Sequence, residues 1–168
     1  REDAAMILGL MGRPEAAEAL IDLVSGRDWD DGWNYRGMGQ FGASVSRMDT
    51  LVMALGRTRD PRGVEPILRK IEALDERSAF SHCRAVSVAA AALADQRLAE
   101  ALYRLLYKPT MQGHAQVDMK AVVSAANSDP IETEARNLAL KELILARGLY
   151  LCGDYNGLGK KILETYAN

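Results

Sequence analysis

The sequence has few aromatic residues and almost no net charge. The first feature bears on how the core packs, and the second on which partners the chain can attract. Only 6% of its 168 residues are aromatic although 48% are hydrophobic, so smaller apolar residues dominate, which suits closely packed helices. The formal net charge of -2 gives no global field that would attract nucleic acid or an acidic membrane surface. No apolar run approaches the ~18 residues of a membrane-spanning helix. We therefore expect neither nucleic acid nor a membrane as a partner.

Residues that could catalyse a reaction or bind a metal ion are also scarce. The two histidines, His82 and His114, belong to no His-Glu metal motif, and the chain has no Ser-His-Asp order and no phosphate-binding loop. His82 precedes Cys83, but adjacent residues on a helix do not face each other, which argues against a nucleophilic pair. Cys83 and Cys152 lie in separate helical segments without metal-type spacing, which indicates two free, packed thiols. We expect no catalytic residue, no metal and no cofactor.

One apolar pattern recurs four times along the chain. Hydrophobic side chains occupy positions i, i+3, i+4 and i+7, which form one stripe of an amphipathic helix. The four stripes are Ala17-Leu20-Ile21-Val24, Val64-Ile67-Leu68-Ile71, Ala99-Leu102-Tyr103-Leu106 and Gly159-Ile162-Leu163-Tyr166, the last with a weaker first member. Recurrence of this kind predicts a solenoid of stacked helical units.

Helix start and stop signals divide the chain into four antiparallel pairs and one extra short helix. Pro14 and the Asp60-Pro61 pair suit helix N-termini, and Asp95 is the expected cap of a third. The predicted helices cover residues 1–11 and 14–25, 44–56 and 61–74, 79–93 and 96–107, 116–126, and 131–151 and 155–166. We predict an all-α solenoid forming one domain over 1–168. We expect it to be a piece of a longer protein, because helical patterns run into both ends.

The second unit carries a family resemblance. Its segment from Leu55-Gly56 through Asp60-Pro61-Arg62 to Leu68 resembles the HEAT repeat of the bilin-lyase type, in which a leucine-glycine, a short spacer and Asp-Pro-Arg precede an apolar helix. The first unit is similar, with Arg13-Pro14-Glu15 in place of Asp-Pro-Arg, and the third keeps the aspartate and arginine without the proline. In the fourth unit only the second helix and Asp154 fit. The resemblance implies the fold and leaves the function open.

Unequal intervals between the stripes locate two insertions, residues 26–43 and 108–130, and insertions in repeat arrays often carry the binding face. Residues 26–42 hold five glycines, three aspartates and both tryptophans of the chain. The candidate contact residues are Asp28, Trp29, Asp30, Asp31, Trp33, Asn34, Tyr35, Arg36 and, if both insertions emerge on one side, His114. Tryptophan gives contact area, aspartate fixes polar groups and glycine permits close approach.

Three interpretations of this segment stay open. It can fold back so that Trp29 and Trp33 cover the helical stack, it can dock on a partner, or it can bind a small polar ligand. Calcium on the three aspartates is a minor variant, because the acidic twelfth position of an EF-hand loop is missing. If the tryptophans form an exposed recognition surface, replacing both with alanine should leave the melting temperature almost unchanged.

Two further patterns bear on function. Arg57, Arg59 and Arg62 cluster around one turn, and because Asp60 lies among them we interpret the cluster as a solvated, capped turn rather than a phosphate-binding ridge. Residues 29–35, 40–42 and 149–155 are similar to the helical C-terminal region of some bacterial FAD-dependent oxidoreductases. That resemblance implies an accessory region without the flavin site. The string at residues 37–42 has Gly-x-Gly-x-x-Gly spacing, but it follows no strand and is no dinucleotide motif.

Together these patterns predict a non-catalytic interaction or scaffold domain that binds a protein or a neighbouring domain of the same chain. The alternative is an accessory domain of a larger flavin-dependent oxidoreductase. The compartment is left open by the sequence, because no targeting segment is present in a chain that we expect to be a fragment.

Overall fold

The computed structural model describes residues 1–35, 46–115 and 134–167, which form eight α-helices and no β-strand. The helices are α1 (Glu2–Leu10), α2 (Ala17–Ser25), α3 (Arg47–Arg57), α4 (Val64–Glu72), α5 (Phe80–Leu93), α6 (Gln96–Leu106), α8 (Glu134–Leu151) and α9 (Leu158–Ala167). Short 3-10 turns lead into α2, α4 and α9. The helices predicted within these ranges are confirmed to within a few residues, whereas the short helix expected at 116–126 lies outside the described residues.

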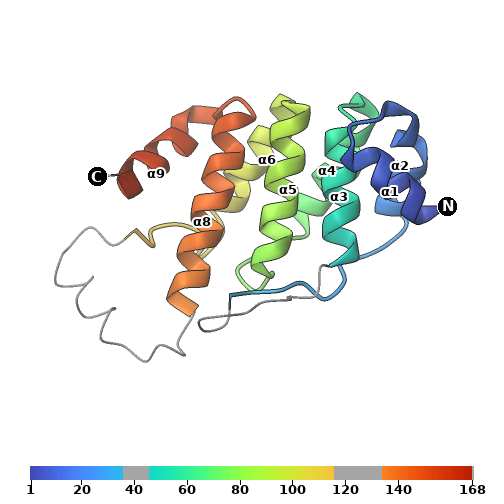
Figure 1. Cartoon of the computed structure of the whole chain (residues 1–168). Helices are drawn as coiled ribbons and strands as arrows, with labels where there is room; N and C mark the ends of the chain where they lie inside the picture. The colour runs from blue at the N-terminus through green and yellow to red at the C-terminus, as the bar shows by residue number, and fades with distance from the viewer. Residues whose placement is uncertain (36–45, 116–133, 168) are drawn as a thin grey trace.

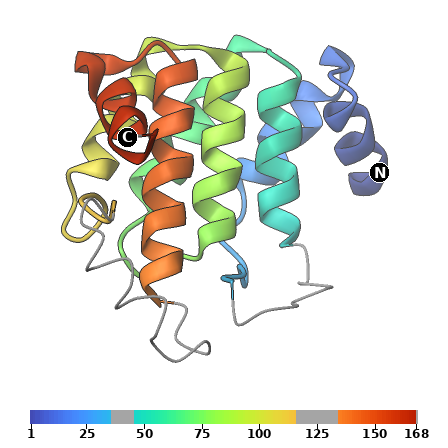
Figure 2. The same cartoon turned by 60° about the vertical axis from the view of Figure 1, so that its left-hand side comes forward.

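The helices stack as pairs in two layers. The first layer holds α1, α3, α5 and α8 side by side, and α2, α4 and α6 form the second layer behind them, with α9 packed against α8 (Figures 1 and 2). This arrangement confirms the all-α solenoid expected from the recurring stripes. None of the helices in the described ranges combines the length and the apolar character needed to cross a membrane.

The hydrophobic core lies between the two layers and contains most of the predicted stripe residues. Leu20, Ile67 and Leu102, which occupy the same position in three successive stripes, are each fully buried. Ile162 is their counterpart in the fourth stripe and is also buried. Full burial of such a side chain contributes roughly 1.5–3 kcal/mol. The apolar stripes predicted from the sequence are therefore the faces with which the second layer packs against the first.

The turns inside the second and third helix pairs share one capping geometry. The backbone N–H of Arg62 donates to the Asp60 carboxylate at 2.9 Å, and Arg97 makes the same bond to Asp95, which confirms both predicted caps. Each of the four turns also contains a residue with a left-handed backbone, and these residues are Gly12, Arg59, Ala94 and Gly153. A residue other than glycine costs about 1 kcal/mol in this conformation.

Neighbouring helices of the first layer approach each other closely at glycines. A Cβ on Gly9 of α1 would lie 3.0 Å from Ala54 of α3, and one on Gly56 of α3 would lie 2.3 Å from the Cα of Ala89 in α5. A Cβ on Gly148 of α8 would lie 2.7 Å from Ser87 of α5. The Leu-Gly pairs that carry the family resemblance therefore mark the places where backbones touch.

Replacing Gly56 with alanine is expected to destabilise the chain by about 2 kcal/mol, because the added methyl group meets the backbone of α5 and the helices must separate. The gain in helix propensity, about 1 kcal/mol, offsets only part of this cost. Chemical denaturation followed by circular dichroism measures the difference. The matched control is Gly63→Ala, where the new methyl group would meet the movable end of Leu55 at 3.0 Å. Equal losses in the two variants would contradict the backbone contact.

Both cysteines are free and buried, as the sequence predicts. Burial raises the pKa of the Cys83 thiol to about 12 and that of Cys152 to about 11. Because the thiolate is the reactive form, we expect a disulfide reagent at about pH 8 to label neither thiol of the folded chain and both after denaturation. Rapid labelling of either thiol under native conditions would contradict their placement in the core.

Candidate functional site

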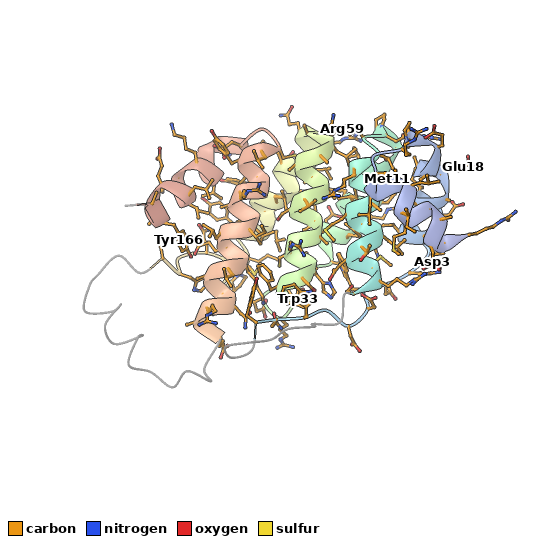
Figure 3. All side chains as sticks on the ribbon, viewed as in Figure 1. Asp3, Met11, Glu18, Trp33, Arg59 and Tyr166 are labelled. Carbon is orange, nitrogen blue, oxygen red and sulfur yellow. The ribbon has the colours of Figure 1, made fainter. Side chains whose placement is uncertain are left out.

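Residues 26–35, which we call the strap, leave the end of α2 and cross the N-terminal ends of α3, α5 and α8 (Figure 1). Figure 3 labels Trp33 at this edge of the first layer. The first backbone N–H groups of a helix have no partner within the helix. The strap supplies acceptors to two of the three helices, as its contacts with each helix show.

The strap reaches α3 through Asp30. One oxygen of its carboxylate accepts the Met48 backbone N–H at 3.1 Å, and the other accepts the Ser46 hydroxyl in a short hydrogen bond. Ser46 in turn caps the helix by accepting the Asp49 N–H at 3.0 Å. Burial acts to raise the pKa of Asp30, but the bonds from Ser46 and the helix backbone outweigh burial and lower that pKa. The carboxylate is therefore held ionised at the helix N-terminus.

The contact with α5 uses two successive strap residues. The Phe80 N–H, the first of the helix, donates to the side-chain oxygen of Asn34 at 2.8 Å. Trp33 exchanges two bonds with Ser81: its carbonyl accepts the Ser81 N–H at 3.1 Å, and its own N–H donates to the Ser81 hydroxyl at 3.0 Å. The Trp33 ring packs edge-on against Phe80 with ring centres 5.4 Å apart. The strap thus completes the start of α5.

The last described strap residue connects to α8. The Asn137 side-chain amide donates to the Tyr35 carbonyl at 2.8 Å and accepts the Tyr35 N–H at the same distance. The Tyr35 ring also lies beside Trp33 and Phe80, at 5.3 Å and 5.2 Å between ring centres. A segment that follows the first unit in sequence is therefore fixed to the fourth.

A buried histidine lies beneath the strap. The Nδ1 atom of His82 is 2.6 Å from the Asp49 carboxylate, and its Nε2 atom is 3.1 Å from the Asp30 carbonyl oxygen. The two ring nitrogens of His82 therefore connect Asp49 of α3 with the backbone of the strap. Trp29 stacks on the same ring with centres 4.4 Å apart. The pair of His82 and Asp49 is largely shielded from solvent, with 6% and 3% of each residue exposed.

Trp29 is held in place by a buried lysine as well. Its indole N–H donates to the Lys70 carbonyl at 3.3 Å, and the Lys70 ammonium lies 5.5 Å from the centre of its ring and donates to the Arg27 carbonyl. Burial lowers the pKa of Lys70, and the nearby carboxylates of Asp28 and Asp30 partly oppose this effect. Lys70 and Asp49 were not among the residues expected to form the site.

The second predicted insertion also packs on α8, at a different place. The buried Glu142 carboxylate accepts the backbone N–H groups of Gly113 and His114 at 2.8 and 2.7 Å, and the Tyr166 hydroxyl at 2.9 Å. Burial, followed by the bond to Glu142, raises the pKa of Tyr166. The His114 ring is 2.7 Å from the Thr110 carbonyl. The interactions of His114 within the described residues are thus with its own loop and α8, and none joins it to the strap.

The candidate residues therefore divide into two sets. Trp29, Trp33 and Asn34 are half-buried and bonded to the helices. Asp28 and Asp31 are exposed, as is 37% of Tyr35, while Arg36 lies outside the described residues. Within the described ranges no group of three or more metal-binding side chains is gathered at one place. The strap thus combines a structural inner side with an accessible outer side.

Comparison with known proteins gives a match over the first unit. The family model described as PBS lyase HEAT-like repeat matches residues 1–26, which contain α1, its turn and α2. No curated protein and no solved structure matches the chain. The similarity to a flavin-dependent oxidoreductase stays a prediction. The family match and the stacked helix pairs together support a HEAT-like helical-repeat fold for this chain.

Proposed function

We propose that this chain is a non-catalytic docking module whose partner, a protein or a neighbouring domain, contacts the outer side of the strap. HEAT-like repeats support a scaffold or interaction role, and a repeat array offers extended surfaces that single domains lack. The thiols of Cys83 and Cys152, which could act as nucleophiles, are both buried.

One observation carries this proposal: three side chains on the outer side of the strap are exposed to solvent. The outer side chains are the carboxylates of Asp28 and Asp31 and the ring of Tyr35, whose backbone is fixed to α8. A tyrosine on a fixed backbone offers contact area at a low entropy cost, and two exposed carboxylates favour a partner with basic groups. We therefore propose a basic partner surface.

The experiment begins with a photo-crosslinking residue in place of Tyr35, in the natural full-length protein and its own cells, to identify the partner. The purified partner is then titrated against the chain and a variant with Asp28→Asn, Asp31→Asn and Tyr35→Ala. We expect the variant to bind about tenfold more weakly, because a few central residues supply most of an interface's affinity. Its melting temperature should stay within a few degrees of the parent's.

The matched control replaces two exposed acidic residues elsewhere, Glu18→Gln and Asp22→Asn on α2. Figure 3 shows Glu18 away from the strap edge. Control affinity should stay within about twofold of the parent's, because long-range charge effects are screened by salt. If the control weakens binding as much as the strap variant does, or if the strap variant binds normally, the outer side of the strap is not the docking surface.

A further inference from the structure

The opposite edge of the first layer carries a groove that the strap does not touch. Figure 3 labels Arg59 and Met11 at this edge, across the molecule from Trp33. The groove has a volume of about 410 Å³ and lies between the C-terminal ends of α1, α3 and α5. Its lining residues are Leu10, Met11, Gly12, Arg57, Arg59 and Ala92. It is therefore formed by three successive units of the solenoid.

The arginines at this edge divide into paired and unpaired ones. Three lie in ion pairs with a carboxylate two residues away, at 3.2, 2.7 and 3.0 Å; these are Arg13 with Glu15, Arg62 with Asp60, and Arg97 with Asp95. Neither Arg57 nor Arg59 forms an ion pair within the described part of the chain. Arg57 donates to the Leu10 carbonyl at 3.2 Å, which satisfies the end of α1 and fixes the guanidinium at the groove. The two unpaired positive charges are thus concentrated in the groove.

Arg59 occupies a backbone position that favours glycine. Its φ of 56° is left-handed, and the corresponding turns of the first and fourth units have Gly12 and Gly153 there. Ala94 shows that another residue can occupy this position in the third unit. At Arg59 the side chain itself lines the groove, so the chain keeps a guanidinium where the backbone alone would prefer glycine. The variant Arg59→Gly therefore removes the charge without straining the turn.

The groove is also apolar beside its charges. Met11 has 70% of its surface exposed, which is unusual for so large a hydrophobic side chain, and Leu10 and Ala92 are partly accessible. Methionine is flexible and adapts to apolar side chains of different shape. An apolar group can thus lie against Met11 while the guanidinium groups hold carboxylates at its sides.

We propose that this groove binds an acidic peptide segment of a partner protein, in which carboxylates flank one apolar side chain. Charge complementarity identifies the occupant, because arginine pairs with carboxylates through two parallel hydrogen bonds. A nucleic acid is the less suitable ligand, since it needs a track of unpaired positive charge, whereas Arg13, Arg62 and Arg97 at the same edge are neutralised. This site is separate from the strap surface and its occupant has the opposite charge.

The test uses the chain and a fluorescent peptide of sequence Glu-Glu-Leu-Glu-Glu, with binding followed by fluorescence anisotropy at low salt. We expect Arg59→Gly and Arg57→Gln each to weaken binding about fivefold, since each removes charge-assisted bonds. Arg59→Gly should at the same time raise the melting temperature by about 2–4 °C. Higher stability with weaker binding separates loss of the site from loss of the fold.

The control variant is Arg62→Gln, which removes a paired arginine from the same edge and should change the affinity by less than about twofold. Peptides with glutamines in place of glutamates, or serine in place of leucine, should also bind several-fold more weakly. Undetectable binding of the acidic peptide, or equal losses for all three arginine variants, would overturn the proposal. Tighter binding of a thymidine oligonucleotide through Arg57 and Arg59 would overturn it in favour of nucleic acid.

Discussion

Replacing His82 with alanine is expected to lower the free energy of unfolding by about 3–5 kcal/mol, because the change leaves the buried Asp49 carboxylate without its partner. One Asp49 oxygen, Oδ2, already lacks a hydrogen bond within the described residues, so the carboxylate depends on the imidazole. The variant also removes the ring on which Trp29 stacks and the donor to the Asp30 carbonyl. Urea denaturation followed by circular dichroism measures the loss.

The double variant His82→Ala with Asp49→Ala should lose less than the sum of the two single variants, since it leaves no uncompensated charge. The matched control is His114→Ala, because His114 is half-exposed and the ring contact found for it among the described residues is with its own loop. We expect this control to cost less than about 1 kcal/mol. A His82 variant as stable as the control would contradict a stabilising contact between His82 and Asp49 beneath the strap.

Replacing Trp29 and Trp33 together with alanine is expected to cost about 3–5 kcal/mol and to lower the melting temperature by roughly 10 °C. The change removes the stack on His82, the contact with Lys70 and the cluster with Phe80, while the backbone bonds of residue 33 to Ser81 remain possible. Differential scanning calorimetry gives the melting temperature. An exposed recognition surface predicts almost no change, so this experiment decides between the two interpretations of the tryptophans.

The control for the tryptophan variant is Tyr150→Ala, which removes an aromatic side chain that is 49% exposed on α8. We expect its melting temperature to fall by no more than a few degrees, since about half of its surface is already exposed. The single variants Trp29→Ala and Trp33→Ala should each lose a substantial part of the total, because the two rings contact different side chains, His82 and Phe80. A double variant that melts within a few degrees of the parent would instead make the tryptophans part of the docking surface.

The sequence predicts the helix pairs well because their signals are local. The apolar stripes, the prolines that open helices and the caps at Asp60 and Asp95 each lie within a few residues of their effect. Their positions therefore agree with the structure to within a few residues. The helix after the strap begins at Arg47 rather than 44, because Ser46 is its N-cap.

The candidate site was only partly predictable because its contacts join distant segments. The composition of residues 26–35 marks the strap as unusual, but nothing local shows which aspartate faces a helix end and which faces solvent. The sequence does contain one indication of the role of Asp49. It lies three residues before Val52 and seven before Gly56, so it shares the buried face of α3. A carboxylate at such a position requires a buried partner, and His82 is the partner supplied by the next unit.

The strap should also change the order in which the repeat units unfold. In a plain repeat protein each unit touches only its neighbours, so units fray from the ends and the array unfolds in stages. Here the bond pair between Tyr35 and Asn137 spans 102 residues and joins the connection after the first unit to the fourth. When the chain is pulled from its two ends, the bonds between Tyr35 and Asn137 must break before the second and third units can be extended. The strap thus adds to this linear array a connection between units that are not neighbours in the stack.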